Sequence, residues 1–245
     1  GISIYKMKLY DEIIEKLQQL VTDRDSKEFE VRDSTWPVAE REMILRSDMA
    51  YELGGGSLPA VGATIVTADE NLISEDGITL VGSDLREIDE DTPFARIAVV
   101  RVDENTIGEG NALYNAIRSL EYTRYHLFPK GFMMRVSSSR NRESVRVSRE
   151  AVTDGISFAE TGNMMISAFH KNPNVKAVHI YYFTKKDFDY KALKSMAEEA
   201  EEITRAIDHI FKNLIMDCRA CNLQEICDEV EGLRELHFKQ KSKEQ

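Results

Sequence analysis

The chain has 245 residues, with 43 acidic and 32 basic side chains, so its formal net charge is −11 at neutral pH. This charge would repel a phosphate backbone and argues against a nucleic-acid-binding protein. The length suffices for one large domain or two small ones with a substantial core, and the longest apolar runs are far too short to cross a bilayer. We therefore expect neither nucleic acid nor a membrane among its partners.

The first half of the chain alternates short helical and strand patterns. Residues 5–21 place apolar side chains on one helical face, which predicts an amphipathic helix and not a signal peptide. The run Gly54-Gly55-Gly56 is the strongest backbone break in the chain. Strands are predicted from β-branched and apolar composition at 29–31, 50–53, 63–67, 78–81 and 94–102.

The second half predicts longer elements. A helix is expected at 111–125, and a strand pair at 131–136 and 144–147 surrounds an arginine-rich bend. Ser148 is positioned to cap a helix that starts at Arg149, and Gly155 and Gly162 are expected to break or bend the region that follows.

A strand at 175–183 and a long helix at 190–216 complete the predicted elements. The interspersed order favours a mixed α/β or α+β fold, with a mixed sheet flanked by helices. We expect one domain over 1–216 and a small cysteine-containing tail over 217–245.

The only cysteines of the chain, Cys218, Cys221 and Cys227, lie within ten residues of one another. Thiols at C-x2-C-x5-C spacing are typical of a metal or iron–sulfur site; a redox pair or chance clustering is the alternative. An odd number of clustered cysteines is not a disulfide framework, and this favours a reducing cytoplasm.

Five arginines lie within fifteen residues of this acidic chain. Arginine forks bind phosphates in bidentate fashion, so the run could form an anion pocket. The alternative is an exposed strand face whose arginines pair with acids such as Glu143 and Glu150. The arginines are Arg135, Arg140, Arg142, Arg146 and Arg149.

Several short phrases, taken in order, resemble the middle domain of the CO-methylating acetyl-CoA synthase, the β subunit of the carbon monoxide dehydrogenase/acetyl-CoA synthase complex. The resemblance covers roughly residues 45–230 and ends in a long charged helix that leads into C-x-x-C. The phrases are Tyr51-Glu-Leu-Gly-Gly-Gly56, Val81-Gly-Ser-Asp84, Val145-Arg-Val-Ser-Arg-Glu-Ala151 and Ile180-Tyr-Tyr-Phe183.

This resemblance implies a [4Fe–4S] cluster held by Cys218, Cys221 and Cys227, although the fourth cysteine of the family pattern is absent. The family's nickel-binding Cys-Gly-Cys and its N-terminal docking domain also have no counterpart here. Nickel is therefore not expected in this chain alone. The resemblance further implies that the arginine run receives coenzyme A or an acyl-CoA.

The sequence leaves two alternatives for the metal site, an iron–sulfur cluster or a zinc ion. Three thiolates can hold a [4Fe–4S] cluster with one open iron, whereas structural zinc usually fills four positions. His237, ten residues after Cys227, is the nearby candidate for a fourth ligand. A continuous helix would place it about 15 Å along the axis from Cys227, so a solvated surface histidine is the alternative.

Three functions follow from these patterns. The chain could be an accessory or divergent iron–sulfur member of the family that binds coenzyme A or a protein partner of one-carbon metabolism in an anaerobe. It could be an acyltransferase completed by a partner chain. It could also be a non-catalytic interaction protein whose tail is stabilised by zinc.

The remaining candidates predict structural roles. Gly54–Gly56 lacks the Gly-Lys-Ser/Thr end of a phosphate loop, so a tight bend or close backbone approach is expected. Trp36 is predicted to be a core or loop anchor. The acidic pairs at 198–199 and 201–202 predict a solvated helix face. The scattered His126, His170, His179 and His209 predict surface or hydrogen-bonded core histidines.

Overall fold

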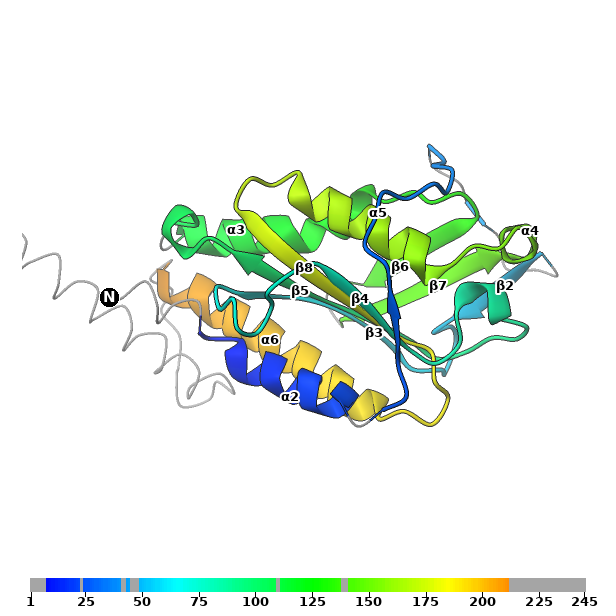
Figure 1. Cartoon of the computed structure of the whole chain (residues 1–245). Coiled ribbons are helices and arrows are strands. Elements are labelled where there is room, and N and C mark those ends of the chain that lie inside the picture. Colours follow the sequence, from blue (N-terminus) through cyan, green and yellow to red (C-terminus); the bar gives the residue numbers. More distant parts are fainter. Residues whose placement is uncertain are drawn as a thin grey trace, which may run out of the picture.

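The computed structural model describes residues 8–22, 24–40, 43–44, 49–108, 111–137 and 141–211, which are built around two β-sheets (Figure 1). The mixed α/β prediction is confirmed. Cys218, Cys221, Cys227, His237, Arg140 and the predicted boundary at 216/217 lie outside the described residues.

The larger sheet has five strands in the order β1-β4-β8-β5-β3. The β3–β5 and β4–β8 pairs are parallel, and the β1–β4 and β5–β8 pairs are antiparallel. Of the three inner strands, β5 and β8 are long and mostly buried, which explains their nearly continuous apolar sequences. The bounds are β1 Lys27–Phe29, β3 Ala60–Thr67, β4 Gly77–Val81, β5 Phe94–Val102 and β8 Val175–Phe183.

The smaller sheet is antiparallel, with the order β2-β7-β6. Its strands are β2 Ala50–Leu53, β6 Phe132–Ser137 and β7 Arg142–Ser148. On β7, buried residues alternate with half-buried ones, because successive side chains of a strand point to opposite faces. One face of this sheet therefore joins the core, and the other face carries Arg142 and Arg146.

Helices cover both faces of the larger sheet (Figure 1). Helix α2, Asp11–Thr22, packs against α6, Tyr190–Phe211, on one side, and α5, Phe158–His170, packs on β4 and β8 on the other. Helix α3, Asn111–Glu121, contacts β3 and α6. No helix in the described ranges is long and apolar enough to cross a membrane.

Short helical turns complete the described chain: η1 Leu85–Glu87, η2 Glu104–Thr106, η3 Tyr122–His126 and α4 Arg149–Thr153. The predicted cap of α4 is confirmed, because the Ser148 side chain accepts a hydrogen bond from the Ala151 backbone N–H. The single helix predicted at 111–125 is instead α3 followed by the tighter turn η3.

The expectation that Gly162 breaks a helix is wrong. Gly162 lies inside the continuous helix α5, where a Cβ atom would stand 2.9 Å from Ile78 Cδ1 of β4. The missing side chain lets the helix pack closely on the sheet. Gly155, in contrast, has φ of +88° and follows the end of α4, as its predicted breaking role requires.

Candidate functional site

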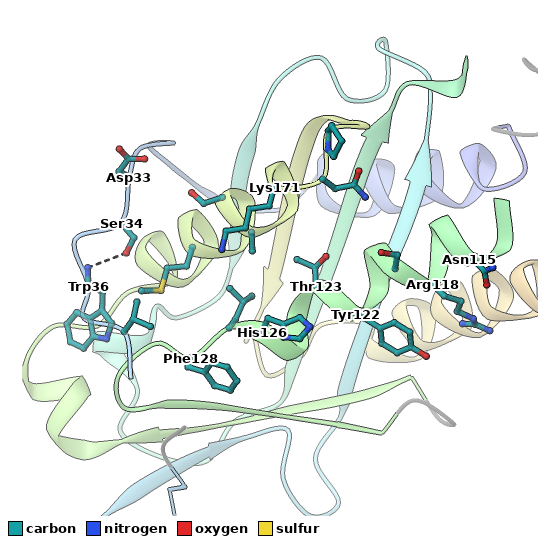
Figure 2. Close-up of a pocket in the computed structure, with 18 residues that line it drawn as sticks. Asp33, Ser34, Trp36, Asn115, Arg118, Tyr122, Thr123, His126, Phe128 and Lys171 are labelled. Carbon is teal, nitrogen blue, oxygen red and sulfur yellow. Dashed lines mark hydrogen bonds between the residues drawn. The ribbon is translucent and has the colours of Figure 1, made fainter. Parts of the chain in front are cut away.

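A cleft of about 1150 Å³ opens between the 33–38 segment, α3 with η3, and the C-terminal end of α5 (Figure 2). Figure 2 shows the side chains of Lys171 and His126 reaching toward the middle of the cleft from two of its walls. Aromatic rings of Trp36, Tyr122 and Phe128 line it as well. The cleft thus combines apolar rings with two side chains that can carry positive charge.

One wall of the cleft is fixed by the carboxylate of Glu160. It accepts hydrogen bonds from the Arg32 guanidinium at 2.5 Å, the Ser34 hydroxyl at 2.6 Å and the Thr35 backbone N–H at 3.0 Å. Burial alone would raise the pKa of Glu160, but these donors stabilise the ionised form and lower the pKa to about 2. The segment before Trp36 is therefore tied to α5.

Trp36 anchors the same wall to the smaller sheet. Its indole N–H donates to the Lys130 carbonyl at 2.8 Å, just before β6 begins. The next residues continue the attachment through a bridge between Val38 and Pro129. The prediction of a loop anchor is confirmed.

Arg118 lines the cleft, but its charge is already paired. Its guanidinium donates to both carboxylate oxygens of Glu201, at 2.8 and 2.9 Å, and to Glu121 at 2.8 Å. Burial would lower the pKa of Arg118, but these bonds raise it overall. The prediction that the acidic pairs form a solvated helix face is wrong at Glu201, whose side chain is only 23% exposed. Lys171 and His126 are thus the other basic side chains that line the cleft.

Two of the predicted anion-binding arginines hold the backbone of their own chain. Arg142 donates to the carbonyls of Gly54 and Gly56, at 2.9 Å each. Both glycines have positive φ, at +78° and +60°, and the predicted tight bend at 54–56 is confirmed. Arg146 donates to the Ile44 carbonyl at 3.2 Å and lies 3.9 Å from the Glu52 carboxylate.

Arg135 and Arg149 keep exposed guanidinium surfaces. Arg135 on β6 makes one hydrogen bond of 3.3 Å to Glu52, and its side chain is 49% exposed. The guanidinium of Arg149 lies 4.6 Å from the ring centroid of Tyr51, a cation–π contact at the surface. Within the described part of the run, Arg142 and Arg146 therefore bind backbone carbonyls, whereas Arg135 and Arg149 keep exposed guanidinium groups.

A buried charge cluster connects the two sheets, and sequence analysis missed it. Arg96 on β5 donates to both carboxylate oxygens of Glu143 on β7, at 2.7 and 2.9 Å, and both side chains are fully buried. Arg124 of η3 adds a third, longer contact to Glu143 at 3.4 Å. The signal was Arg96, which is one of two arginines, with Arg101, in the otherwise apolar strand 94–102. Its partner lies 47 residues away, so no local spacing reveals it.

Two of the scattered histidines have hydrogen-bond partners, as predicted. His170 contacts Asp76 at 2.9 Å, and His179 contacts the Thr79 hydroxyl at 2.7 Å. Burial lowers the pKa of His179 to about 4. Among the described residues, no group of three or more His, Cys, Asp or Glu side chains could hold a metal ion.

The sequence model of the family described as "CO dehydrogenase/acetyl-CoA synthase complex beta subunit" matches residues 32–188. The chain belongs to this family. The matched segment begins at the Arg32 wall of the cleft and includes both strand pairs of the smaller sheet. The family resemblance inferred from the short phrases is confirmed.

Three curated relatives are named as beta subunits of an acetyl-CoA decarbonylase/synthase complex. Acetyl-CoA decarbonylase/synthase complex subunits beta 1 and beta 2 of Methanosarcina mazei, and subunit beta 1 of Methanosarcina thermophila, are each 25% identical over 182 residues. The alignments cover 73% of this chain but only 36% of each relative. The chain thus spans about a third of the length of these complex subunits.

In this β-subunit family member, the phrases that carry the resemblance occupy structural joints. The Glu-Leu-Gly-Gly phrase forms β2 and the bend held by Arg142. Asp84, which ends the second phrase, accepts hydrogen bonds from the Ser157 hydroxyl at 2.6 Å and the Phe158 N–H at 2.8 Å. These two phrases therefore mark connections within the domain, and the residues that line the cleft lie outside all four phrases.

Proposed function

We propose that the chain is an accessory or divergent iron–sulfur protein of the CO dehydrogenase/acetyl-CoA synthase β-subunit family, acting in the cytoplasm of an anaerobe. The observation that carries the proposal is the trio Cys218, Cys221 and Cys227, which begins seven residues after the end of α6 in a member of this family. Since the relatives are named as complex subunits, we propose that it acts with a protein partner of one-carbon metabolism and does not complete acetyl-CoA synthesis alone.

The donor set fits a cluster. Three thiolates within ten residues match the ligand type of iron–sulfur sites and would leave one iron for another ligand. A bound cluster would supply electron transfer or an open iron. His237 is the candidate fourth ligand for zinc, the alternative metal, and nickel is not proposed for this chain alone.

Anaerobic purification followed by iron, sulfide and zinc analysis tests the proposal. We expect bound iron and sulfide with visible charge-transfer absorbance. Cys221→Ser should abolish metal binding and leave the far-ultraviolet circular dichroism spectrum largely unchanged, because the described core lies upstream. His237→Ala, the matched control, should keep the cluster. One tightly bound zinc without colour would overturn the proposal in favour of a zinc-stabilised interaction protein.

We further propose that the exposed arginines of the run bind the phosphates of coenzyme A or an acyl-CoA. Arg135 and Arg149 carry this proposal, with Arg140 beyond the described residues, because Arg142 and Arg146 already bond to backbone carbonyls. Guanidinium forks bind phosphate in bidentate fashion.

Calorimetric titration with coenzyme A tests this second proposal. Binding should weaken as salt rises, because exposed ion pairs are screened. Arg135→Ala should weaken binding several-fold, whereas Arg86→Ala, at an arginine that is 58% exposed elsewhere on the surface, should not change it. Equal affinity for the wild type and Arg135→Ala would contradict the assignment.

A further inference from the structure

Strand β6 is the outer strand of the smaller sheet, and in the described part of the chain no strand pairs with its open edge. The Ser148 N–H donates to the Gly131 carbonyl at 2.9 Å. This bond shows which residues of β6 direct their backbone groups toward β7. Every second residue from Gly131 therefore bonds toward β7, and the residues between them face outward. The backbone N–H and C=O groups of Met134 and Val136 thus point to the open edge.

A groove of about 330 Å³ follows this edge. The register pairs Met133 with Arg146 on one face, and Met134 with the buried Val145 on the other. Since side chains from both faces of β6 line the groove, it runs along the edge and not over one face. Its rim is open, because Met43 and Tyr125 are 78% and 40% exposed.

The positive charge around the open edge of β6 favours an acidic segment as the binding partner. Residues 129–142 contain four cationic residues and no acid, in a chain of net charge −11. Pairing of β6 with a second copy of itself would bring Arg135 close to its symmetry mate, and like charges across a strand pair are unfavourable. An acidic segment instead meets complementary charge at Arg135.

We propose that β6 binds an extended acidic segment of a partner protein by strand addition. Main-chain hydrogen bonds form to Met134 and Val136, alternate apolar side chains enter the groove, and acidic side chains approach Arg135. The proposal is independent of the iron–sulfur cluster and requires no coenzyme A. It assigns the smaller sheet a docking role.

The test uses the full chain and a seven-residue peptide that alternates valine with glutamate or aspartate, with a lysine-for-acid peptide as charge control. Calorimetry measures affinity, and hydrogen exchange measures protection at Met134 and Val136. We expect the acidic peptide to bind and to protect these amides. Val136→Pro removes the outward N–H without touching the β7 ladder and should weaken binding at least about tenfold.

Val136→Thr keeps the N–H and is the matched control, which should bind within about twofold of the wild type. Arg135→Glu should weaken the acidic peptide and strengthen the lysine peptide. No binding at millimolar peptide, or equal binding to Val136→Pro and the wild type, would overturn the proposal. A wild-type dimer that Val136→Pro converts to a monomer in sedimentation would assign the edge to a second copy and would also overturn it.

Discussion

At the scale of single residues, the buried Arg96–Glu143 pair links the two sheets. Both side chains are fully buried, and their two hydrogen bonds join β5 to β7. Gly62 makes room for it, since a Cβ there would stand 2.4 Å from Glu143 Cβ. Moving charges out of water is costly, so a buried ion pair adds little net stability to the fold. Its main effect is to specify which edges of the two sheets meet.

Glu143→Gln should destabilise the fold strongly, because it leaves two buried guanidinium groups without their counter-charge while keeping the side chain's shape. We expect a loss on the order of 3 kcal/mol in the free energy of unfolding, measured by urea denaturation. The control is Glu201→Gln, which breaks a partly exposed pair with Arg118 and should cost about 1 kcal/mol or less. Equal losses would show that burial of the Glu143 charge is not decisive.

At the scale of elements, sequence predicted best where the determining pattern is local. Strands 94–102 and 175–183 match β5 and β8 in full, because an apolar run bounded by turn residues is a complete local description of a buried strand. The Ser148 cap is similarly local. The end of the predicted helix is instead the turn η3, in which Arg124 contacts Glu143 of β7, and the hydrophobic periodicity of the sequence does not reveal this contact.

The glycine at position 162 of α5 is explained by a tertiary contact and not by the local sequence. A glycine in a helix interior costs stability relative to alanine, so its presence in α5 reflects the contact with Ile78 on β4 and not a helix break. The sequence alone shows that glycine lowers the helix propensity at this position, but it does not show that Ile78 of β4 packs against it.

Gly162→Ala should therefore destabilise the protein by about 1 kcal/mol despite the better helix propensity of alanine, because overpacking outweighs the gain. Ile78→Val, which removes the nearest atom at 2.9 Å, should cost about 1 kcal/mol alone by leaving a small void. The double variant should lose less than the sum of the single losses in urea unfolding. Strict additivity would show that the two side chains do not compete for this space.

At the scale of the whole molecule, the candidate site was only partly predictable. The alternation of Arg142 and Arg146 on β7 follows from a strand's period of two, but their carbonyl partners at 44 and 54–56 come from distant segments. The cleft near Trp36 is formed by three segments that only the fold brings together. The cysteine trio stays a prediction, since it lies outside the described residues.

Two titrating groups make the stability of the whole domain depend on pH. His179 stacks on Tyr181 with ring centroids 4.2 Å apart, and burial lowers its pKa to about 4 from the usual 6.5. The Thr79 hydroxyl donates its proton to Glu28, so His179 Nε2 must donate to Thr79, which fixes the neutral tautomer. Glu160 has a pKa lowered to about 2 by its donors.

Acidification should destabilise the domain in two successive ranges. Between pH 6.5 and pH 4 the unfolded chain binds a proton at His179 that the folded chain excludes, so stability falls by up to about 3 kcal/mol. Between pH 4.5 and pH 2 the same linkage acts through Glu160, whose ionised form is held by Arg32 and Ser34 in the folded state only.

Urea unfolding measured from above pH 6.5 down to pH 4 should therefore show falling stability in the wild type and a flatter profile in His179→Gln. Glu160→Gln is the matched control, because it should leave the slope in this range largely intact and flatten the profile only below pH 4.5. If His179→Gln kept the wild-type slope between pH 6.5 and pH 4, the histidine would be taking up its proton in the folded state. Its burial beside Thr79 would then not control the acid response of the domain.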